Sequence, residues 1–272
     1  MDRNEHESAC RLAQIQERIG NCTGCPRLVA HRQQVAEQKV RRFRSESYWG
    51  KPVPSFGDPL ARLLIIGLAP AAHGANRTGR AFTGDRSGDW LYEALHRFRF
   101  ASRPKSSHRQ DGLALYDCYI TQVIHCAPPG NKPDRQEIAN CQPYFLDELR
   151  ALSNVEVIIP LGRVAFDAYL RAYRQIGTTL PAPRPRFEHG KLTRLPTGHA
   201  ILSSYHPSQQ NTQTGRLTRA MFHHVFATAR RVLDGNYGEG SEPTGKPRGC
   251  SASPPRGVRS RSQGSRTKPS GR

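Results

Sequence analysis

Four short apolar runs divide the chain and predict buried strands, at residues 62–67, 118–124, 155–161 and 200–205. Around them, apolar residues recur every three or four positions, as on one face of a helix. This spacing predicts helices over residues 5–20, 27–42, 87–99, 134–152, 163–174 and 214–233. Strands that alternate with helices predict a doubly wound, three-layer α/β/α fold with a central, mainly parallel four-stranded sheet.

The pattern stops after Gly235, and this change predicts the domain organisation. Beyond it Ser, Pro, Gly, Arg and Lys dominate and the apolar periodicity is lost, as is typical of disordered segments. We therefore expect one folded domain over 1–234 and a basic, disordered tail over 235–272. In doubly wound sheets, ligands bind beyond the carboxyl ends of the strands. The chemistry is therefore expected in the segments that follow the strands.

The charge of the chain indicates a polyanionic partner. Lys and Arg number 41 against 22 Asp and Glu, a formal net charge of +19, and the folded part stays basic without the tail. Nucleic acid is the first candidate and an anionic membrane surface the second. The longest apolar run, 63–72, is far shorter than the roughly 20 residues of a membrane span, and no signal peptide is visible. We expect a soluble, cytoplasmic protein.

Seven cysteines cannot all pair in disulfides, so metal ligands or free thiols are the better interpretation. Cys22 and Cys25 form a CxxC pair, and Cys126 and Cys141 are candidates for a second, widely spaced pair. Four thiolates would complete a zinc site or an iron–sulfur cluster, although a zinc ribbon would use a second tight CxxC. Alternatively, Cys126 and Cys141 are buried apolar residues. The other three cysteines take no part in this pattern: Cys10, Cys118 and Cys250.

The segment after the first strand, 67–85, contains small residues that allow a ligand to approach the backbone closely. It fits neither GxGxxG nor the P-loop pattern, so a nucleotide cofactor is unsupported. Phe82 is either a stacking platform for a base or an ordinary packing residue. Asp85 is either a catalytic carboxylate or the N-cap of the following helix. Taken by themselves, both residues favour the structural interpretation.

The segment after the fourth strand, 204–218, begins with His206 at the carboxyl edge of the sheet. Amide and hydroxyl side chains follow, and such a loop can hydrogen-bond bases and phosphates. The alternative is a plain polar connector in which Thr214 caps the last helix.

Together these segments resemble the uracil-DNA glycosylase superfamily, and most of all its type-B (family 5) iron–sulfur branch. The matching pieces follow the family's order over about residues 10–233. They are Cys22-x-x-Cys25, 52–58, 67–74, 77–85, 126–133 and 206–211. The related type-A branch carries an acidic residue where this chain has Leu68, which favours type B.

The resemblance implies that Cys22, Cys25, Cys126 and Cys141 ligate a [4Fe–4S] cluster with a structural or DNA-positioning role. It also implies hydrolysis of the N-glycosidic bond of a deaminated base in DNA. Such a base must leave the helical stack before an enzyme can reach the bond.

Roles for individual residues follow from the same resemblance. The implied catalytic residues are His206, which would stabilise the oxygen of the leaving base, Asp85, which would activate water and stabilise the sugar cation, and Asn211, which would hold the extrahelical nucleotide. Phe82 would stack on the base. The other implied contacts are Ala69, Pro70 and Gln122 with the base, and Arg77, Ser208, Gln209 and Arg216 with DNA.

Gln122 departs from the family pattern, in which Asn or Ala is frequent at this position. Its longer reach alters the pocket, so the excision of hypoxanthine by type-B relatives does not transfer directly. One alternative function is a non-catalytic iron–sulfur DNA-binding protein on the same scaffold. Another is a thiol-redox enzyme using Cys22-x-x-Cys25, which the position of the motif before the first strand disfavours. We expect DNA as the partner and a monomeric protein.

Overall fold

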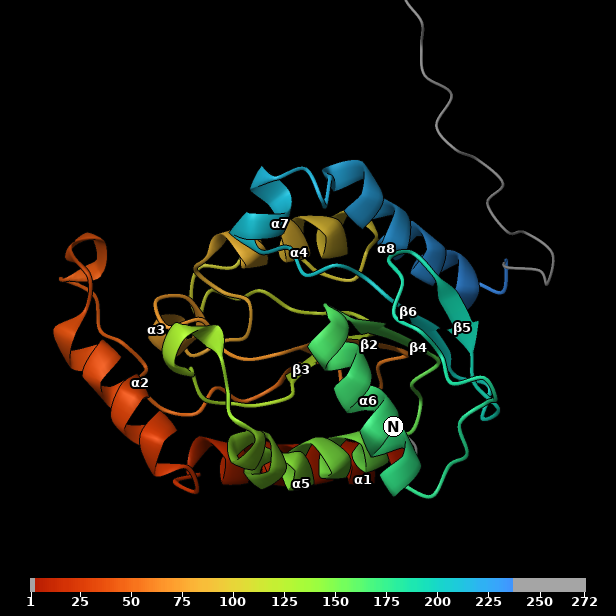
Figure 1. The fold of residues 1–272 in the computed structure, drawn as a ribbon, viewed down its shortest axis with the longest axis horizontal. Helices are drawn as coiled ribbons and strands as arrows, with labels where there is room; N and C mark the ends of the chain where they lie inside the picture. The colour runs from red at the N-terminus through yellow and green to blue at the C-terminus, as the bar shows by residue number, and fades with distance from the viewer. Residues whose placement is uncertain (1–2, 237–272) are drawn as a thin grey trace, which may run out of the picture. The chain divides into compact units, whose positions relative to one another are not determined.

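The computed structural model describes residues 3–236, and these contain a six-stranded sheet of order β1-β3-β2-β4-β6-β5 (Figure 1). The four inner strands run parallel and match the predicted runs: β2 (Leu63–Gly67), β3 (Cys118–Gln122), β4 (Val157–Pro160) and β6 (Ala200–Leu202). The predicted α/β/α fold class is confirmed, but the predicted number of four strands was too low. Two short antiparallel edge strands complete it, β1 (Phe56–Gly57) and β5 (Leu192–Arg194).

Each predicted helix is present. They are α1 (Arg3–Gly20), α2 (Pro26–Gln38), α4 (Arg86–Arg97), α5 (Arg135–Ala151), α6 (Arg163–Gln175) and α8 (Arg219–Leu233). Two short helices inside the connections were not predicted, α3 (Ala75–Thr78) and α7 (Gln209–Gln213). The last helix begins later than expected because Thr218, not Thr214, is its N-cap, and the Thr218 hydroxyl accepts from the Met221 N–H over 3.2 Å.

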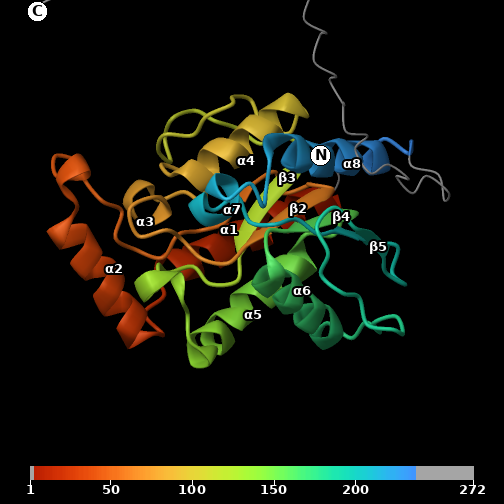
Figure 2. The ribbon, with the colours of Figure 1, turned by 45° about the horizontal axis from the view of Figure 1, so that its top comes forward.

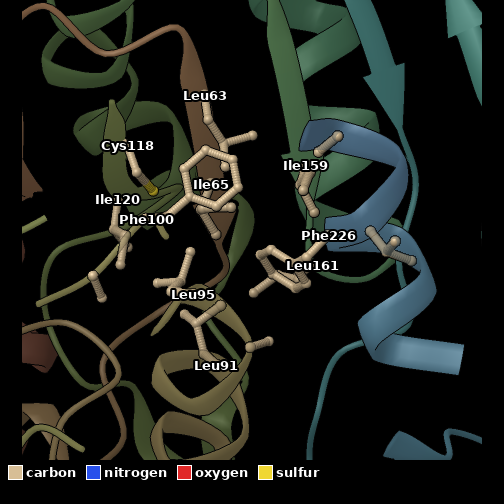
Figure 3. Close-up of a cluster of buried hydrophobic side chains, with 14 of the residues drawn as sticks. Leu63, Ile65, Leu91, Leu95, Phe100, Cys118, Ile120, Ile159, Leu161 and Phe226 are labelled. Atoms are coloured by element: carbon tan, nitrogen blue, oxygen red, sulfur yellow. The ribbon is translucent and has the colours of Figure 1, made fainter. Parts of the chain in front are cut away.

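The sheet is covered by helices on both faces, α4 and α8 on one and α1, α5 and α6 on the other (Figures 1 and 2). Successive side chains of a strand point to opposite faces, and β2 follows this rule. Leu63 and Ile65 pack with α4 and α8 (Figure 3), whereas Leu64 and Ile66 pack with the other three helices. All four side chains are fully buried. Because both faces of β2 are covered, its sequence is a continuous apolar run.

None of the helices in residues 3–236 is long and apolar enough to cross a membrane. The predicted tail lies outside the described residues from position 237 onward, as does Cys250.

Candidate active site and cysteine cavity

The parallel strands bring the predicted site segments to one edge of the sheet. Gly67 and Gln122 are paired residues at the ends of β2 and β3. On the other side of β2, Leu161 bridges Ser204 just beyond β4 and β6. The segments that carry Phe82, Gln122 and His206 therefore start from neighbouring positions.

Phe82 packs on the end of β2 in a strained backbone conformation. A Cβ atom on Gly67 would lie 2.8 Å from the Phe82 ring, so only glycine leaves room for it. The φ of Phe82 is +52°, a left-handed value that costs a non-glycine residue about 1–3 kcal/mol. Its ring centroid lies 5.9 Å from that of His206, with the planes tilted by 32°. The structure thus brings these two predicted site residues together.

His206 is held as a neutral imidazole. Burial lowers its pKa to about 4, so the ring carries a single N–H near pH 7 and can donate a hydrogen bond without being charged. The Asn211 side chain donates to the His206 carbonyl over 2.9 Å. Asn211 therefore helps to fix His206, and its contact with a nucleotide stays a prediction.

Asp85 is both a helix cap and part of a cavity wall. Its Oδ1 accepts from the Gly88 N–H over 3.0 Å, as the N-cap of α4. Burial raises the pKa of Asp85 against the opposing effect of backbone hydrogen bonds from Gly88 and Ser87. The carboxylate packs against Gly74, where an added Cβ would lie 2.2 Å from Oδ2. Asp85 also lines the same cavity as His73 and Gln209. Its position therefore agrees both with a helix cap and with a catalytic carboxylate.

Gln122 has an amide that no protein group uses. The residue is 1% exposed, and its Nε2 has no hydrogen-bond partner among the described residues. A buried amide donor without a partner is costly. This unpartnered donor at the end of β3 marks Gln122 as a candidate contact for a ligand.

The four cysteines predicted to bind metal line a single cavity. Cys22 and Cys25 come from the α1–α2 turn, Cys126 from the loop after β3, and Cys141 from α5. Among residues 3–236, no three Cys, His, Asp or Glu side chains are arranged to hold one metal ion. The cysteines therefore share one cavity, and their binding of a metal stays a prediction.

Each of these sulfurs also has a polar neighbour. The Asn140 amide donates to the Cys25 sulfur over 3.4 Å. The polar neighbours of the other three are Tyr144 for Cys22, Arg32 for Cys126 and the His125 backbone for Cys141. Burial raises the pKa of Cys126 to about 12 and also raises the pKa of Cys141. These thiols are neutral near pH 7, so a metal would have to displace their protons.

The sequence matches the family model of the Uracil DNA glycosylase superfamily over residues 54–230. The chain belongs to the uracil DNA glycosylase superfamily. It is 48% identical to a type-5 uracil-DNA glycosylase of Mycobacterium tuberculosis over 226 residues, 83% of this chain and 82% of that protein. Identity to the type-5 uracil-DNA glycosylase of Thermus thermophilus is 49% over 211 residues, 78% of this chain and 93% of that protein.

More distant matches lie outside the type-5 group. A type-4 uracil-DNA glycosylase of Pyrobaculum aerophilum is 27% identical over 198 residues, 72% of this chain and 83% of that protein. The solved structure of Pedobacter heparinus SMUG2 aligns with a TM-score of 0.39 and 15% identity, over 65% of this chain and 78% of that chain. The identities near 48% place the chain in the type-5 branch of the superfamily.

Arg77 is largely buried in the segment between β2 and α4. Its side chain is 9% exposed and forms an ion pair with Glu46. It also donates to the carbonyls of His73 and Gly84, over 2.8 Å and 3.0 Å. The guanidinium therefore braces the segment that leads to Asp85, and the residue lines the same cavity. Its contact with DNA stays a prediction.

The other predicted contacts lie along the same edge of the sheet. Ser208 is the N-cap of α7, Gln209 is exposed in the cavity of Asp85, and Arg216 is exposed with its guanidinium 4.7 Å from the Tyr205 ring centroid. Ala69 is partly exposed and Pro70 is buried in the turn after β2. The DNA contacts of these residues stay predictions.

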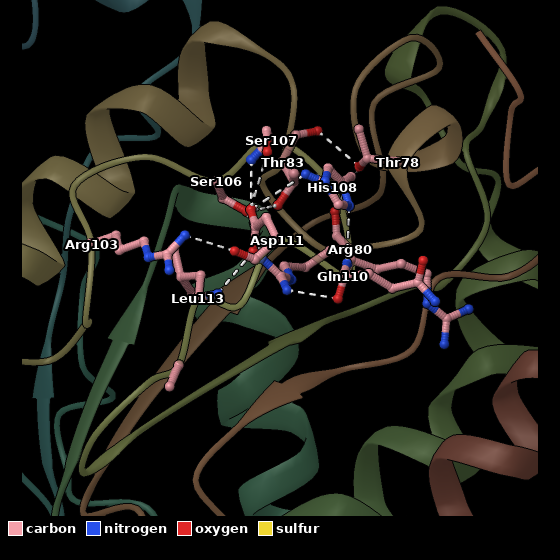
Figure 4. Close-up of polar contacts among 12 residues, drawn as sticks. Thr78, Arg80, Thr83, Arg103, Ser106, Ser107, His108, Gln110, Asp111 and Leu113 are labelled. Carbon is pink, nitrogen blue, oxygen red and sulfur yellow. Dashed lines mark hydrogen bonds and ion pairs between the residues drawn. The ribbon is translucent and has the colours of Figure 1, made fainter.

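A buried ion pair beside the site was not predicted (Figure 4). Arg80 donates to Asp111 over 2.7 Å and to Ser106 over 2.9 Å, and the side chains of the ion pair are 4% and 9% exposed. Ser106 in turn hydrogen-bonds Thr83 over 2.7 Å. Residues 102–113 thus clamp the segment that carries Phe82. Residues 102–113 show no apolar periodicity in the sequence. The opposite charges of Arg80 and Asp111 are the only sequence feature that could have indicated this ion pair.

Proposed function

We propose that this protein is a uracil-DNA glycosylase of base-excision repair, which hydrolyses the N-glycosidic bond of uracil in DNA. The observation that carries the proposal is the convergence of Phe82, Gln122 and His206 at one edge of the sheet. The high identity to type-5 uracil-DNA glycosylases supports the same activity.

The geometry supports a division of labour in the reaction. Phe82 offers an aromatic face to a flipped base, and the unpartnered amide of Gln122 reads its edge. As the bond breaks, negative charge develops on the base, and the neutral His206 donates a hydrogen bond to its oxygen. Asp85 orients water and, when ionised, stabilises the positive charge on the sugar.

Gln122 also supports a breadth beyond uracil. A glutamine amide presents one acceptor and two donors, and rotation by half a turn exchanges them. With Nε2 unbound by the protein, the amide can match either uracil or hypoxanthine. We therefore propose that hypoxanthine in DNA is a second substrate.

We propose further that Cys22, Cys25, Cys126 and Cys141 hold a [4Fe–4S] cluster. Four thiolates are the donor set that such clusters use, and the four cysteines line one cavity. When bound, the cluster would tie the α1–α2 turn to α5 and the loop after β3. Iron and acid-labile sulfide analysis, with absorbance near 400 nm, tests this assignment.

DNA is the proposed partner, bound by a basic, monomeric protein acting in the cytoplasm, at the nucleoid in a bacterial cell. Contacts with phosphates make affinity fall as salt rises. Binding of uracil-containing DNA at several salt concentrations, together with the mass of the protein in solution, tests both statements.

The activity is tested with matched labelled oligonucleotides that hold one uracil, one hypoxanthine or only normal bases, followed by alkali to cut abasic sites. Cleavage confined to the deaminated bases is the expected result. A folded protein with its cluster that releases no base would favour the alternative, a non-catalytic iron–sulfur DNA-binding protein.

A further inference from the structure

The ring of His189 packs beside the segment that carries His206. His189 lies in the connection between α6 and β5, far in sequence from His206. Its ring stacks on Tyr205, with centroids 4.8 Å apart and planes 9° from parallel. Tyr205 is the residue directly before His206, so His189 packs one residue away from the imidazole of the proposed reaction.

His189 accepts a hydrogen bond from the backbone next to His206. The Tyr205 N–H donates to Nδ1 over 3.0 Å. Since Nδ1 accepts, the proton of the neutral ring must lie on Nε2. The Met221 backbone, in the first turn of α8, lies near the ring. His189 therefore fixes the backbone just after β6.

The surroundings favour this neutral form. Burial and then the neighbouring His224 lower the pKa of His189. The other charged groups close by are Arg216, which lies over the Tyr205 ring, and the Glu188–Lys191 ion pair on the same segment. A protonated ring would add a cation beside His224 and would remove the acceptor for Tyr205.

We propose that His189 is a positioning residue for His206, a role that rests on the proposed glycosylase function. Tyr205 N–H is bound by His189, and the His206 carbonyl is bound by Asn211 over 2.9 Å. The two hydrogen bonds flank His206 and together set the direction of its ring. Loss of the hydrogen bond between Tyr205 and His189 would allow His206 to move. Such a movement lowers the rate of excision, because a shift of about 1 Å in a reacting group can reduce a rate about a hundredfold.

Two amide variants separate the acceptor from the ring. His189→Asn can place a carbonyl oxygen near the Nδ1 position and keep the bond from Tyr205. His189→Gln reaches the Nε2 position instead and leaves Tyr205 without its acceptor, while both variants lose the stacked ring. In steady-state excision of uracil, we expect kcat to fall about tenfold in His189→Gln with KM within about twofold, and kcat to stay within about threefold of the parent in His189→Asn.

His199→Gln is the matched control, because His199 lies in the β5–β6 hairpin that follows His189, contacts Tyr169 over 3.3 Å, and has its pKa lowered by burial as well. It should excise uracil at the parental rate. Thermal unfolding checks that each variant folds. If His189→Gln does not fold, His189→Phe replaces it, because phenylalanine keeps an aromatic ring but has no hydrogen-bond acceptor.

Parental kcat in His189→Gln would overturn the proposal. Equal losses in His189→Asn and His189→Gln would overturn it too, since they would trace the effect to the ring. A parental protein that releases no uracil would instead overturn the proposed function.

Discussion

The two segments that carry the proposed reaction are held in different ways. Residues 67–85, after β2, are clamped by the buried Arg80–Asp111 pair and its hydrogen bonds to Ser106. Residues 203–218, after β6, are held mainly by hydrogen bonds to the backbone, and Gln209 and Gln210 in α7 are exposed.

The difference matches the demands on each segment. Phe82 keeps a left-handed φ of +52°, and a strained residue persists only where its surroundings over-determine it. A rigid first segment therefore supplies a preformed face for the base. The second segment has fewer buried contacts and more exposed polar side chains, so it is the one free to adapt to DNA.

Removing the clamp should have the largest effect on stability. Asp111→Ala leaves Arg80 as an unpaired buried charge, which costs about 3–5 kcal/mol. Chemical denaturation measures this loss, and uracil excision should fall with it because Phe82 is released. Arg103→Gln is the control, since Arg103 donates to the Asp111 carbonyl from an exposed position, and it should change stability by less than about 0.5 kcal/mol. Equal stabilities of Asp111→Ala and the parent would refute the clamp.

The same pair predicts a pH dependence of stability. Burial opposes ionisation of Asp111, but hydrogen bonds from Leu113 N–H, Arg80 and Ser107 N–H outweigh it and hold the pKa well below the ordinary aspartate value. A depressed folded pKa gives stability that is present above the unfolded value of about 3.9 and is lost as pH falls through the folded value. Acid titration of the unfolding free energy should show a steeper loss in the parent than in Asp111→Ala.

His206→Ala should separate activity from stability in the second segment. Loss of one preorganised donor to a developing oxyanion lowers kcat by about 10²- to 10³-fold, and the loss of activity should far exceed the loss of stability. Single-turnover excision and thermal unfolding give the two readouts. Excision at the parental rate by a folded variant would remove His206 from the mechanism.

Much of the fold could be predicted because its core strands are buried on both faces. Three of the inner strands, β2, β4 and β6, are continuous apolar runs, and the helices show their own period. The edge strands could not be predicted, since β1 and β5 contain two and three residues. One of them lies in a Gly- and Pro-rich stretch.

The candidate site was predictable where residues directly follow a strand or lie within a familiar motif. Phe82 and His206 meet as that rule requires. His189 and Asp111 were missed because they come from connections without periodicity, and a sequence does not show which loops fold back. The ion pair of Arg77 was missed for the same reason, since its partner Glu46 lies 31 residues away.

Asp85→Asn tests whether the rigid segment contributes charge or only a cap. Asparagine is as good an N-cap as aspartate, so the melting temperature should change little. If the carboxylate acts on water or the sugar, kcat should fall about 10- to 100-fold. Asp85→Ala loses both the helix cap and the carboxylate, and is measured alongside Asp85→Asn for comparison. Equal activities of Asp85→Asn and the parent would leave Asp85 as a helix cap.

The smallest effect is expected at the exposed edge of the adaptable segment. Arg216→Gln removes one proposed phosphate contact, so the slope of log affinity against log salt should decrease in magnitude by about 1, with a uniform loss across sequences. Arg171→Gln is the control, because Arg171 is an exposed arginine in the second half of α6, away from the carboxyl ends of the strands. Titration of uracil-containing and normal duplexes at several salt concentrations measures both slopes. An unchanged slope in Arg216→Gln would place DNA elsewhere and would leave this arginine as a cover for Tyr205.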